Sequence, residues 1–471
     1  MPTAHNLIVV IADTLRRDYL GCYGNPAIRT PHIDSFARDS VLFTSSHPES
    51  LPTIVYRRAF HTGRRVFPLR QYAPVKWDIV RLPGWQPMAD EDDTLAETLF
   101  SSGYHTGFVT DTLPYFAPGM NFTRGFLQWE FVRGQQQDRW RSPHAVPKEL
   151  LARYGDADAI LREYERDRFH DLAIRHAANT MSVHAEEDTA TARVFRWAAE
   201  FLNDNRNAHP FYLLVDSFAP HEPWEAPPSY YSLYKPASFR GRTVIHTRYG
   251  PLDGQMSEAE FVNMKAHYAG LVSLVDSWFG RLIEQLKVLG LYDSSLIVFT
   301  SDHGTNFADN PERIVGKPAH AMYPGVMSTP LLIHFPHGEG AGGVRDGLIS
   351  SVDIVATLYQ AAGLDPAAHS DGRALQGVGK GENARPYVTC RYGDYLWYRD
   401  ARHWVVFDCD GRARSLFDLR ADPGCMRNAV AEAGAEILET AWAKVLHDAG
   451  GHVPDYRHQF DSATDAIGQR Q

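Results

Sequence analysis

Two hydroxyl side chains that could serve as nucleophiles lie three residues apart in one short segment. This segment, ESLPTIVYRRAFHTGRR at residues 49–65, places Ser50 and Thr53 on either side of a proline, and arginines follow them. A hydroxyl attacks an ester efficiently only when a base or a metal activates it and cations stabilise the developing charge. The segment alone leaves open which hydroxyl, if either, does chemistry.

Acidic and imidazole side chains follow three strongly apolar runs elsewhere in the chain. Asp13 ends the run NLIVVIAD, His221 follows HPFYLLVDSFAP, and Asp302 and His303 follow SSLIVFTS. Each run is typical of a buried parallel strand. Because ligands bind outside the carboxyl ends of such strands, we expect these four side chains to share one rim of a sheet.

Apolar runs and amphipathic helical patterns alternate over most of the chain. TPLLIHFP at residues 329–336 is a fourth apolar run, and residues 261–291 form a long amphipathic pattern. This alternation indicates an α/β fold with a parallel sheet covered on both faces. Residues 129–189 are polar and rich in Arg and His, and we predict a helical insertion over the rim. Over residues 376–471, the sequence pattern predicts an antiparallel sheet, followed by a helix and a polar tail.

Composition and charge restrict the function classes. The 471 residues are 44% apolar and 22% charged, as in an ordinary globular protein. The formal net charge of -10 argues against a nucleic-acid partner, which requires clustered basic charge. No apolar run reaches the ~20 residues of a membrane span, and the N-terminus lacks the features of a secretory signal. We therefore expect a cytoplasmic protein with reduced thiols and no membrane partner.

Six motifs occur in an order that resembles the sulfatase family of the alkaline phosphatase superfamily. They are NLIVVIADTLRRDYLGCYGN, TPHIDSFARDSVLF, the arginine segment ending in TG, PHEPW, LGLYDSSLIVFTSDHGT and GK…YP…TPLLIHFP. The resemblance implies an alkaline-phosphatase-like α/β catalytic domain over residues 1–375, with a mixed, mostly parallel sheet. It also implies a smaller C-terminal antiparallel subdomain and a metal-dependent ester hydrolase.

The resemblance distinguishes the two hydroxyls. The family signature begins with Cys or Ser, has Arg four residues later and reaches Thr-Gly nine residues later. Counting back from Thr62 and Gly63 places Thr53 first and Arg57 at the arginine position, whereas no arginine lies four residues after Ser50. We therefore predict Thr53 as the nucleophile and interpret Ser50 as a turn or helix-capping residue.

Threonine at this position departs from the family, in which a cysteine is oxidised to formylglycine. The formylglycine hydrate expels sulfate by using its second hydroxyl, which threonine lacks. A phosphothreonine, in contrast, is an ordinary covalent intermediate that a metal site can hydrolyse. Phosphoethanolamine and lipoteichoic-acid transferases of the superfamily are similar in using a threonine. The sequence therefore favours phosphate or phosphonate esters over sulfate esters.

The resemblance also implies one divalent metal ion held by Asp13, Thr53, Asp302 and His303. Oxygen donors with one nitrogen suit Mn, Mg, Ca or Zn. Many family members carry a second aspartate where Thr14 stands, and the loss of this carboxylate favours Mn or Zn.

Three residues at positions that match the family motifs are expected to supply positive charge for the transferred group. Arg57 is expected to contact the nucleophile and its anion. His221 in PHEPW and Lys317 in VGKP are expected to hold the non-bridging oxygens or to protonate the leaving group. Arg58, one residue further along a helix, points elsewhere and is interpreted as structural.

Several further residues are weaker candidates. No Lys or His follows FVTDTLPYF, where sulfatases commonly place both, so only pocket-lining roles are predicted there. Because Asp216 lies near His221 in the sequence, a site with two metal ions stays an open alternative. His320 is a candidate residue on the rim, and His105 is interpreted as structural. The pocket-lining candidates are Asp111, Thr112 and Tyr115.

The favoured function is a single-metal hydrolase that acts on a small anionic phosphate or phosphonate ester. Thr53 attacks phosphorus, and water then releases the product. Two alternatives stay open: a sulfatase that works without formylglycine, and a non-catalytic protein that only binds an anion. The sequence does not identify the organic part of the substrate, and assembly into a homo-oligomer stays open.

Overall fold

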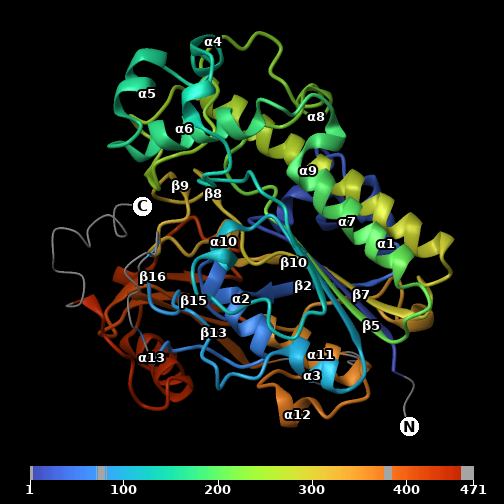
Figure 1. Cartoon of the computed structure of the whole chain (residues 1–471). Coiled ribbons are helices and arrows are strands. Elements are labelled where there is room, and N and C mark those ends of the chain that lie inside the picture. Colours follow the sequence, from blue (N-terminus) through green and yellow to red (C-terminus); the bar gives the residue numbers. More distant parts are fainter. Residues whose placement is uncertain (1–3, 71, 73–79, 81, 376–384, 458–471) are drawn as a thin grey trace.

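The computed structural model describes residues 4–70, 72, 80, 82–375 and 385–457, and its core is a nine-stranded mixed sheet (Figure 1). The strand order is β11-β2-β10-β7-β1-β5-β3-β4, and β12 pairs with β2. The strands are β1 (Asn6–Ala12), β2 (Val41–His47), β3 (His105–Thr110), β4 (Gln128–Phe131), β5 (Phe211–Ser217), β7 (Ser295–Thr300), β10 (Thr329–His334), β11 (Val344–Arg345) and β12 (Ile349–Ser350).

The centre of the sheet is parallel, as predicted. β1 lies between β5 and β7 and runs parallel to both, and β3 runs parallel to β5. The fourth apolar run of the sequence forms β10, which is antiparallel to β7 and to β2. The predicted mixed, mostly parallel sheet is therefore confirmed, and the carboxyl ends of β1, β5 and β7 lie side by side.

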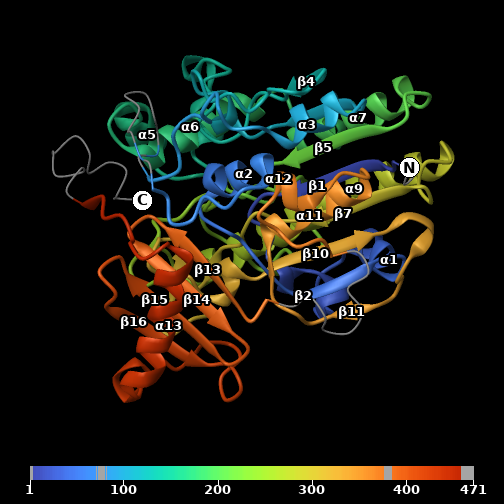
Figure 2. The same ribbon diagram turned by 90° about the horizontal axis from the view of Figure 1, so that it is seen from below.

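Alternate residues of β1 enter two separate hydrophobic cores. Ile8 and Val10 pack in the core that contains residues of α7 and α9, while Leu7 and Val9 pack in the core that contains residues of α2 and α11. This follows from the two-residue period of a strand. Figure 2 shows helices on either side of the sheet. They are α1 (Pro31–Arg38), α7 (Ala190–Asp204) and α9 (Glu258–Val288) on one face, and α2 (Thr53–Thr62), α3 (Leu95–Ser101) and α11 (Ser351–Ala361) on the other.

The C-terminal part is a separate antiparallel sheet of four strands in chain order, as predicted. Its elements are β13 (Tyr387–Tyr392), β14 (Tyr395–Asp400), β15 (His403–Asp408), β16 (Ala413–Asp418) and the helix α13 (Ala435–Asp448). The predicted domain boundary after residue 375 falls beside residues 376–384, which lie outside the described residues, and it stays a prediction.

Short helices lie above the carboxyl ends of the parallel strands (Figure 1). They are α4 (Lys148–Leu151), α5 (Ala157–Glu163) and α6 (Arg168–Thr180), within the range predicted as a helical insertion, and α8 (Pro228–Tyr231). Residues 129–131 of that range belong instead to the edge strand β4. None of the helices in the described part of the chain is both long and apolar enough to span a bilayer.

Candidate active site

Two aspartates and a histidine meet at the carboxyl ends of β1 and β7. Asp13 follows directly after β1, and Asp302 and His303 come two and three residues after β7 ends. One ligand atom from each residue lies within 4.8 Å of the others, and all three side chains are buried. The structure thus brings together three of the four residues predicted to bind the metal, on the rim where they were expected.

Thr53 supplies the fourth predicted ligand from the first turn of α2. Its Oγ1 lies 3.4 Å from His303 Nε2. His303 Nδ1 lies 3.0 Å from the carbonyl oxygen of Gly304, to which it donates a hydrogen bond. The lone pair of Nε2 therefore faces Thr53 and the two carboxylates, which is the tautomer that a metal ligand requires.

Burial holds the start of α2 in place. All ten residues of this helix are buried, and its apolar side chains belong to the core beneath the sheet. Gly63 ends the helix in a left-handed conformation, with φ of 66°, that favours glycine. A helix fixed on every side positions the Thr53 hydroxyl more precisely than a surface loop would.

Ser50 does not cap this helix. The residue at the N-cap position is Pro52, no side chain makes a capping hydrogen bond, and the buried Oγ of Ser50 has no hydrogen-bond partner. Of the two interpretations of Ser50, the helix cap is therefore wrong, because the chain enters α2 through a proline that cannot donate and has no polar side chain. Ser50 lies in a bend of the chain, which agrees with the other interpretation, a turn residue.

Arg57 lies one turn after Thr53 and joins three buried carboxylates. Its Nη1 donates to Asp302 Oδ2 at 2.6 Å, and its Nη2 lies 3.0 Å from Asp13 Oδ2. Its Nε and Nη2 both donate to Asp216, at 2.8 and 2.7 Å. Burial alone would lower the pKa of Arg57, but the three carboxylates raise it well above its usual value. Arg57 is thus a permanent positive charge beside Thr53.

Asp216 is a counter-ion for Arg57 that sequence reasoning did not recognise. Its carboxylate accepts both Arg57 bonds and a third from the Tyr115 hydroxyl at 2.6 Å. Among the described residues, the only group suited to hold a metal is Asp13, Asp302 and His303. The available signal was a carboxylate inside FYLLVDS, where a buried strand needs a reason to carry charge.

The site geometry fits a divalent cation. Burial and the neighbouring Asp302 raise the pKa of Asp13 well above its usual value. His303 and Arg57 hold the pKa of Asp302 below its usual value, although burial opposes them. Asp13 Oδ2 has no hydrogen bond despite its proximity to Arg57. A cation between the two carboxylates would satisfy this oxygen and favour ionisation of both aspartates.

Lys317 and His221 meet at Glu222, a second residue missed from the sequence. Lys317 Nζ donates to Glu222 Oε2 at 2.8 Å and to Thr14 Oγ1 at 3.1 Å. His221 Nδ1 lies 2.7 Å from the Glu222 carbonyl oxygen and 3.1 Å from Oε2, and Tyr249 donates to Oε1 at 2.9 Å. Glu222 therefore orients both predicted cationic residues.

Thr14, predicted to stand where a second aspartate is common, makes hydrogen bonds within the site. Its hydroxyl donates to Asp13 Oδ1 at 2.7 Å, and its backbone N–H donates to Asp302 Oδ1 at 3.0 Å. These bonds hold both carboxylates in place. Thr14 also accepts from Lys317, so it links the metal ligands to the nearby cation.

His221 and Lys317 differ in charge. Burial, together with the charge of Lys317, lowers the pKa of His221 to about 3. His221 is consequently neutral near pH 7, with its Nδ1 proton directed at Glu222. Near Glu222, the positive charge therefore comes from Lys317, and His221 contributes an uncharged imidazole ring.

The weaker candidates have other contacts. Asp111 accepts a hydrogen bond from the Phe218 backbone at 2.6 Å, and burial raises its pKa to about 6. His105 packs against Phe201 with ring centroids 5.8 Å apart, which agrees with a structural role. His320 lies 4.0 Å from Glu312 and is not part of the metal-ligand cluster.

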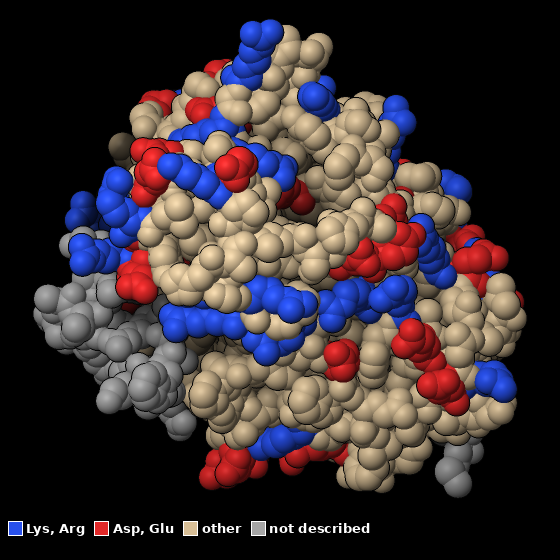
Figure 3. Space-filling model, turned by 45° about the horizontal axis from the view of Figure 1, so that its top comes forward, with Lys and Arg blue, Asp and Glu red and all other residues tan. Residues whose placement is uncertain are grey.

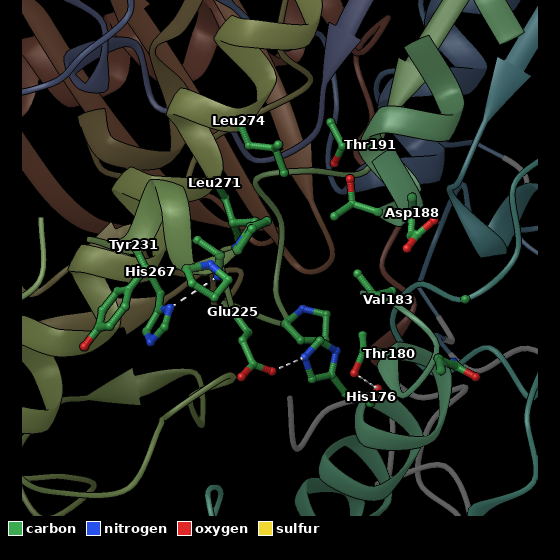
Figure 4. A pocket seen from close by; sticks show the side chains of 18 of the residues that line it. His176, Thr180, Val183, Asp188, Thr191, Glu225, Tyr231, His267, Leu271 and Leu274 are labelled. Atoms are coloured by element: carbon green, nitrogen blue, oxygen red, sulfur yellow. Dashed lines mark hydrogen bonds and ion pairs between the residues drawn. The ribbon is translucent and has the colours of Figure 1, made fainter. Parts of the chain in front are cut away.

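A cavity of about 1020 Å³ begins at His221 and extends beneath the short helices. Glu225 and His176 meet in its wall, and His267 stacks on Tyr231 with ring centroids 4.0 Å apart (Figure 4). The face in Figure 3, with the top of the molecule brought forward, is hollowed, and both basic and acidic side chains border the hollow. The cavity is large enough for a drug-sized organic group.

Glu225 makes this wall sensitive to acid. Burial alone would raise its pKa, but His176, Tyr154 and Arg153 lower it from 4.5 to about 2. The stabilisation is present above pH 4.5 and is lost as the pH falls from 4.5 to about 2, and it amounts to about 3 kcal/mol. We expect Glu225→Gln to lower the thermal midpoint at pH 7 and to have little effect near pH 2.5. Thermal unfolding at both pH values measures this, and an equal loss at both would exclude the charge as its cause.

Family models match nearly the whole chain. The model described as Sulfatase matches residues 5–364, and the model described as N-sulphoglucosamine sulphohydrolase, C-terminal, matches residues 319–449. The chain belongs to the sulfatase family. Members of this family are ester hydrolases of the alkaline phosphatase superfamily that bind a divalent metal, so the chain is a hydrolase of sulfuric or phosphonic esters.

Relatives of this sulfatase-family hydrolase include both kinds of esterase. Human arylsulfatase A is 28% identical over 454 residues, which cover 89% of this chain and 78% of the relative. The multifunctional alkaline phosphatase superfamily protein PehA of Trinickia caryophylli is 23% identical and covers 79% of this chain and 76% of the relative. The phosphonate monoester hydrolase of Agrobacterium radiobacter has the same fold, with a TM-score of 0.69, 21% identity and 97% of each chain covered.

Proposed function

We propose that this sulfatase-family hydrolase cleaves phosphate or phosphonate esters with Thr53 as its nucleophile. The observation that carries the proposal is the position of Thr53 Oγ1, 3.4 Å from His303 Nε2 and at the start of the helix that carries Arg57. Threonine has a single hydroxyl and cannot form the hydrate that releases sulfate from formylglycine. A phosphothreonine is hydrolysed by attack of water on phosphorus.

In the first step, Thr53 Oγ forms a bond to phosphorus while the bond from phosphorus to the ester oxygen breaks. The Thr53 proton passes to solvent, and the leaving oxygen takes a proton from Lys317, which regains one from solvent. Asp13, Asp302, His303 and Thr53 would hold a divalent ion, Mn or Zn in our proposal, and this ion would supply positive charge that favours the ionised hydroxyl. Arg57 and Lys317 stabilise the negative charge on the phosphoryl oxygens.

In the second step, water attacks phosphorus and the bond to Thr53 Oγ breaks. This regenerates the hydroxyl and releases phosphate or phosphonate. The organic group of the ester leaves into the cavity that begins at His221. The size of this cavity supports a substrate whose organic part is considerably larger than a methyl or ethyl group.

Sulfate-ester hydrolysis is the second candidate, and the match to arylsulfatases favours it. The purified protein should be loaded separately with Mn, Zn, Mg and Ca and assayed with aryl phosphate, phosphodiester, phosphonate and sulfate substrates. We expect the highest kcat/KM on a phosphorus ester. Faster release of sulfate than of phosphate or phosphonate would reverse the order of the two candidates.

Glu222 offers a test of how the cationic side of the site is held. We expect Glu222→Gln to lower kcat/KM on the preferred ester by up to about 100-fold, because Lys317 loses its anionic partner, whereas His221 Nδ1 keeps its hydrogen bond to the backbone carbonyl oxygen of residue 222. The same variant should weaken inhibition by vanadate, which a change in folding alone would not produce. Tyr249→Phe removes only the hydrogen bond to Oε1 and serves as the matched control, with a smaller effect.

A further inference from the structure

A second cavity, of about 590 Å³, is lined by residues of β2 in the main sheet and of β14 and β15 in the C-terminal sheet. Figure 2 shows these two sheets next to each other. Arg17 and Arg399 both line it, with the hydroxyl residues Thr44, Ser45 and Ser328. We call it the arginine cavity. None of the described residues that line it is acidic, and none belongs to the candidate active site.

Neither arginine of this cavity has an anionic partner. Arg17 donates to the carbonyl oxygen of Thr44. Arg399 donates to His47 Nε2, while His47 Nδ1 donates to the Met327 carbonyl oxygen at 2.7 Å. His47 is therefore neutral, and its contact with Arg399 compensates no charge. Among the described residues, no carboxylate forms an ion pair with Arg17 or Arg399 within 4.0 Å.

The neighbouring carboxylates have other partners. Asp18, next to Arg17, accepts two bonds from Arg16 at 2.6 and 2.8 Å. Asp400, next to Arg399, accepts from the Tyr398 hydroxyl and from backbone N–H groups of residues 402 and 403. The two arginines thus line one cavity, and neither forms an ion pair with a carboxylate among the described residues.

Arg399 is also largely shielded from water. Its Nε is buried and has no hydrogen-bond partner. Burial, together with the positive charge of Arg17, lowers the pKa of Arg399 to about 10. A guanidinium in this state gains from any anion that supplies acceptor oxygens, because desolvation strengthens the interaction.

We propose that the arginine cavity binds a tetrahedral oxyanion, phosphate or sulfate, between Arg17 and Arg399. Two guanidinium groups present the planar donors that suit such oxygens, and the hydroxyls of Ser45 and Ser328 line the same space. The oxyanion arrives either as the free ion or as a substituent of a larger molecule, for which the cavity has room. The site joins the two sheets, so its occupancy should stabilise the contact between them.

The test uses the full-length, metal-loaded protein in a buffer free of phosphate and sulfate. Titration calorimetry with inorganic phosphate and with inorganic sulfate should show a binding event beyond that of the active site. Arg17→Gln and Arg399→Gln should each weaken this event at least tenfold. The inhibition constant of phosphate for turnover, which reports the active site, should stay within twofold. Arg206→Gln, at an exposed arginine elsewhere, is the control.

Thermal unfolding without added anion separates binding from a structural role. Removing one of two uncompensated charges should leave the midpoint of Arg17→Gln equal to that of the wild type or higher, and the gain that phosphate gives should shrink. An unchanged affinity of the second binding event in both arginine variants, or an Arg17→Gln variant whose midpoint falls equally with and without phosphate, would overturn the proposal. Binding of a phosphorylated or sulfated sugar in place of the inorganic ions would identify the substituent as the source.

Discussion

Replacing Thr53 by alanine abolishes turnover, with an expected loss in kcat of at least about 10⁴-fold. The loss follows because the covalent step has no other hydroxyl 3.4 Å from His303 Nε2. Metal affinity should change little, since Asp13, Asp302 and His303 remain in place. Single-turnover kinetics and metal titration of the purified variant measure the two quantities separately.

Ser50 provides the matched control. Its hydroxyl is buried three residues away and makes no hydrogen bond, so Ser50→Ala should retain activity within about twofold. Thr53→Ser keeps a hydroxyl and should retain measurable turnover. Equal losses in Ser50→Ala and Thr53→Ala, or normal activity in Thr53→Ala, would remove Thr53 from the mechanism.

Replacing Arg57 by alanine has the second large effect, and it acts on stability as well as on activity. Three buried carboxylates lose their shared cation, which should cost about 3–5 kcal/mol in the free energy of unfolding. Activity should fall to background. Added Mn or Zn should stabilise this variant more than it stabilises the wild type, because the ion supplies positive charge between Asp13 and Asp302.

Arg58 is the neighbouring control for Arg57. As predicted, its side chain points elsewhere, and it donates to the backbone carbonyl oxygens of Gly84 and Gln86. Arg58→Ala should lose some stability yet keep its turnover, and metal should stabilise it as much as it stabilises the wild type. If metal protects the Arg57 and Arg58 variants equally, Arg57 does not balance the charge of the metal site.

The sequence predicts the sheet and the clustering of the candidate metal ligands well because their signals are local. Apolar runs specify β1, β5 and β7. A polar residue at the carboxyl end of a buried parallel strand lies at the rim of the sheet. Asp13, Asp302 and His303 are thus brought together as expected. The register of Thr53 and Arg57 required the family signature, because Ser50 carries the same hydroxyl and lies only three residues away.

The partners of the cationic residues could not be predicted in this way. Asp216 and Glu222 act on residues 159 and 95 positions away, and no local pattern encodes such a contact. The helix-cap interpretation of Ser50 is wrong for a related reason. Its exclusion from the helix cap depends on the path of the chain through Leu51 and Pro52, both of which pack in the interior.

The cavity beside His221 and the reacting groups are built from different parts of the chain. The candidate metal ligands follow the fully buried strands β1 and β7, and Thr53 begins the buried helix α2. Much of the cavity wall, including His176, Thr180 and Val183, comes instead from α6 and the loop after it. Changes in that wall can alter which organic group fits without displacing Thr53. Substrate specificity could therefore change during evolution while the reaction mechanism stays the same.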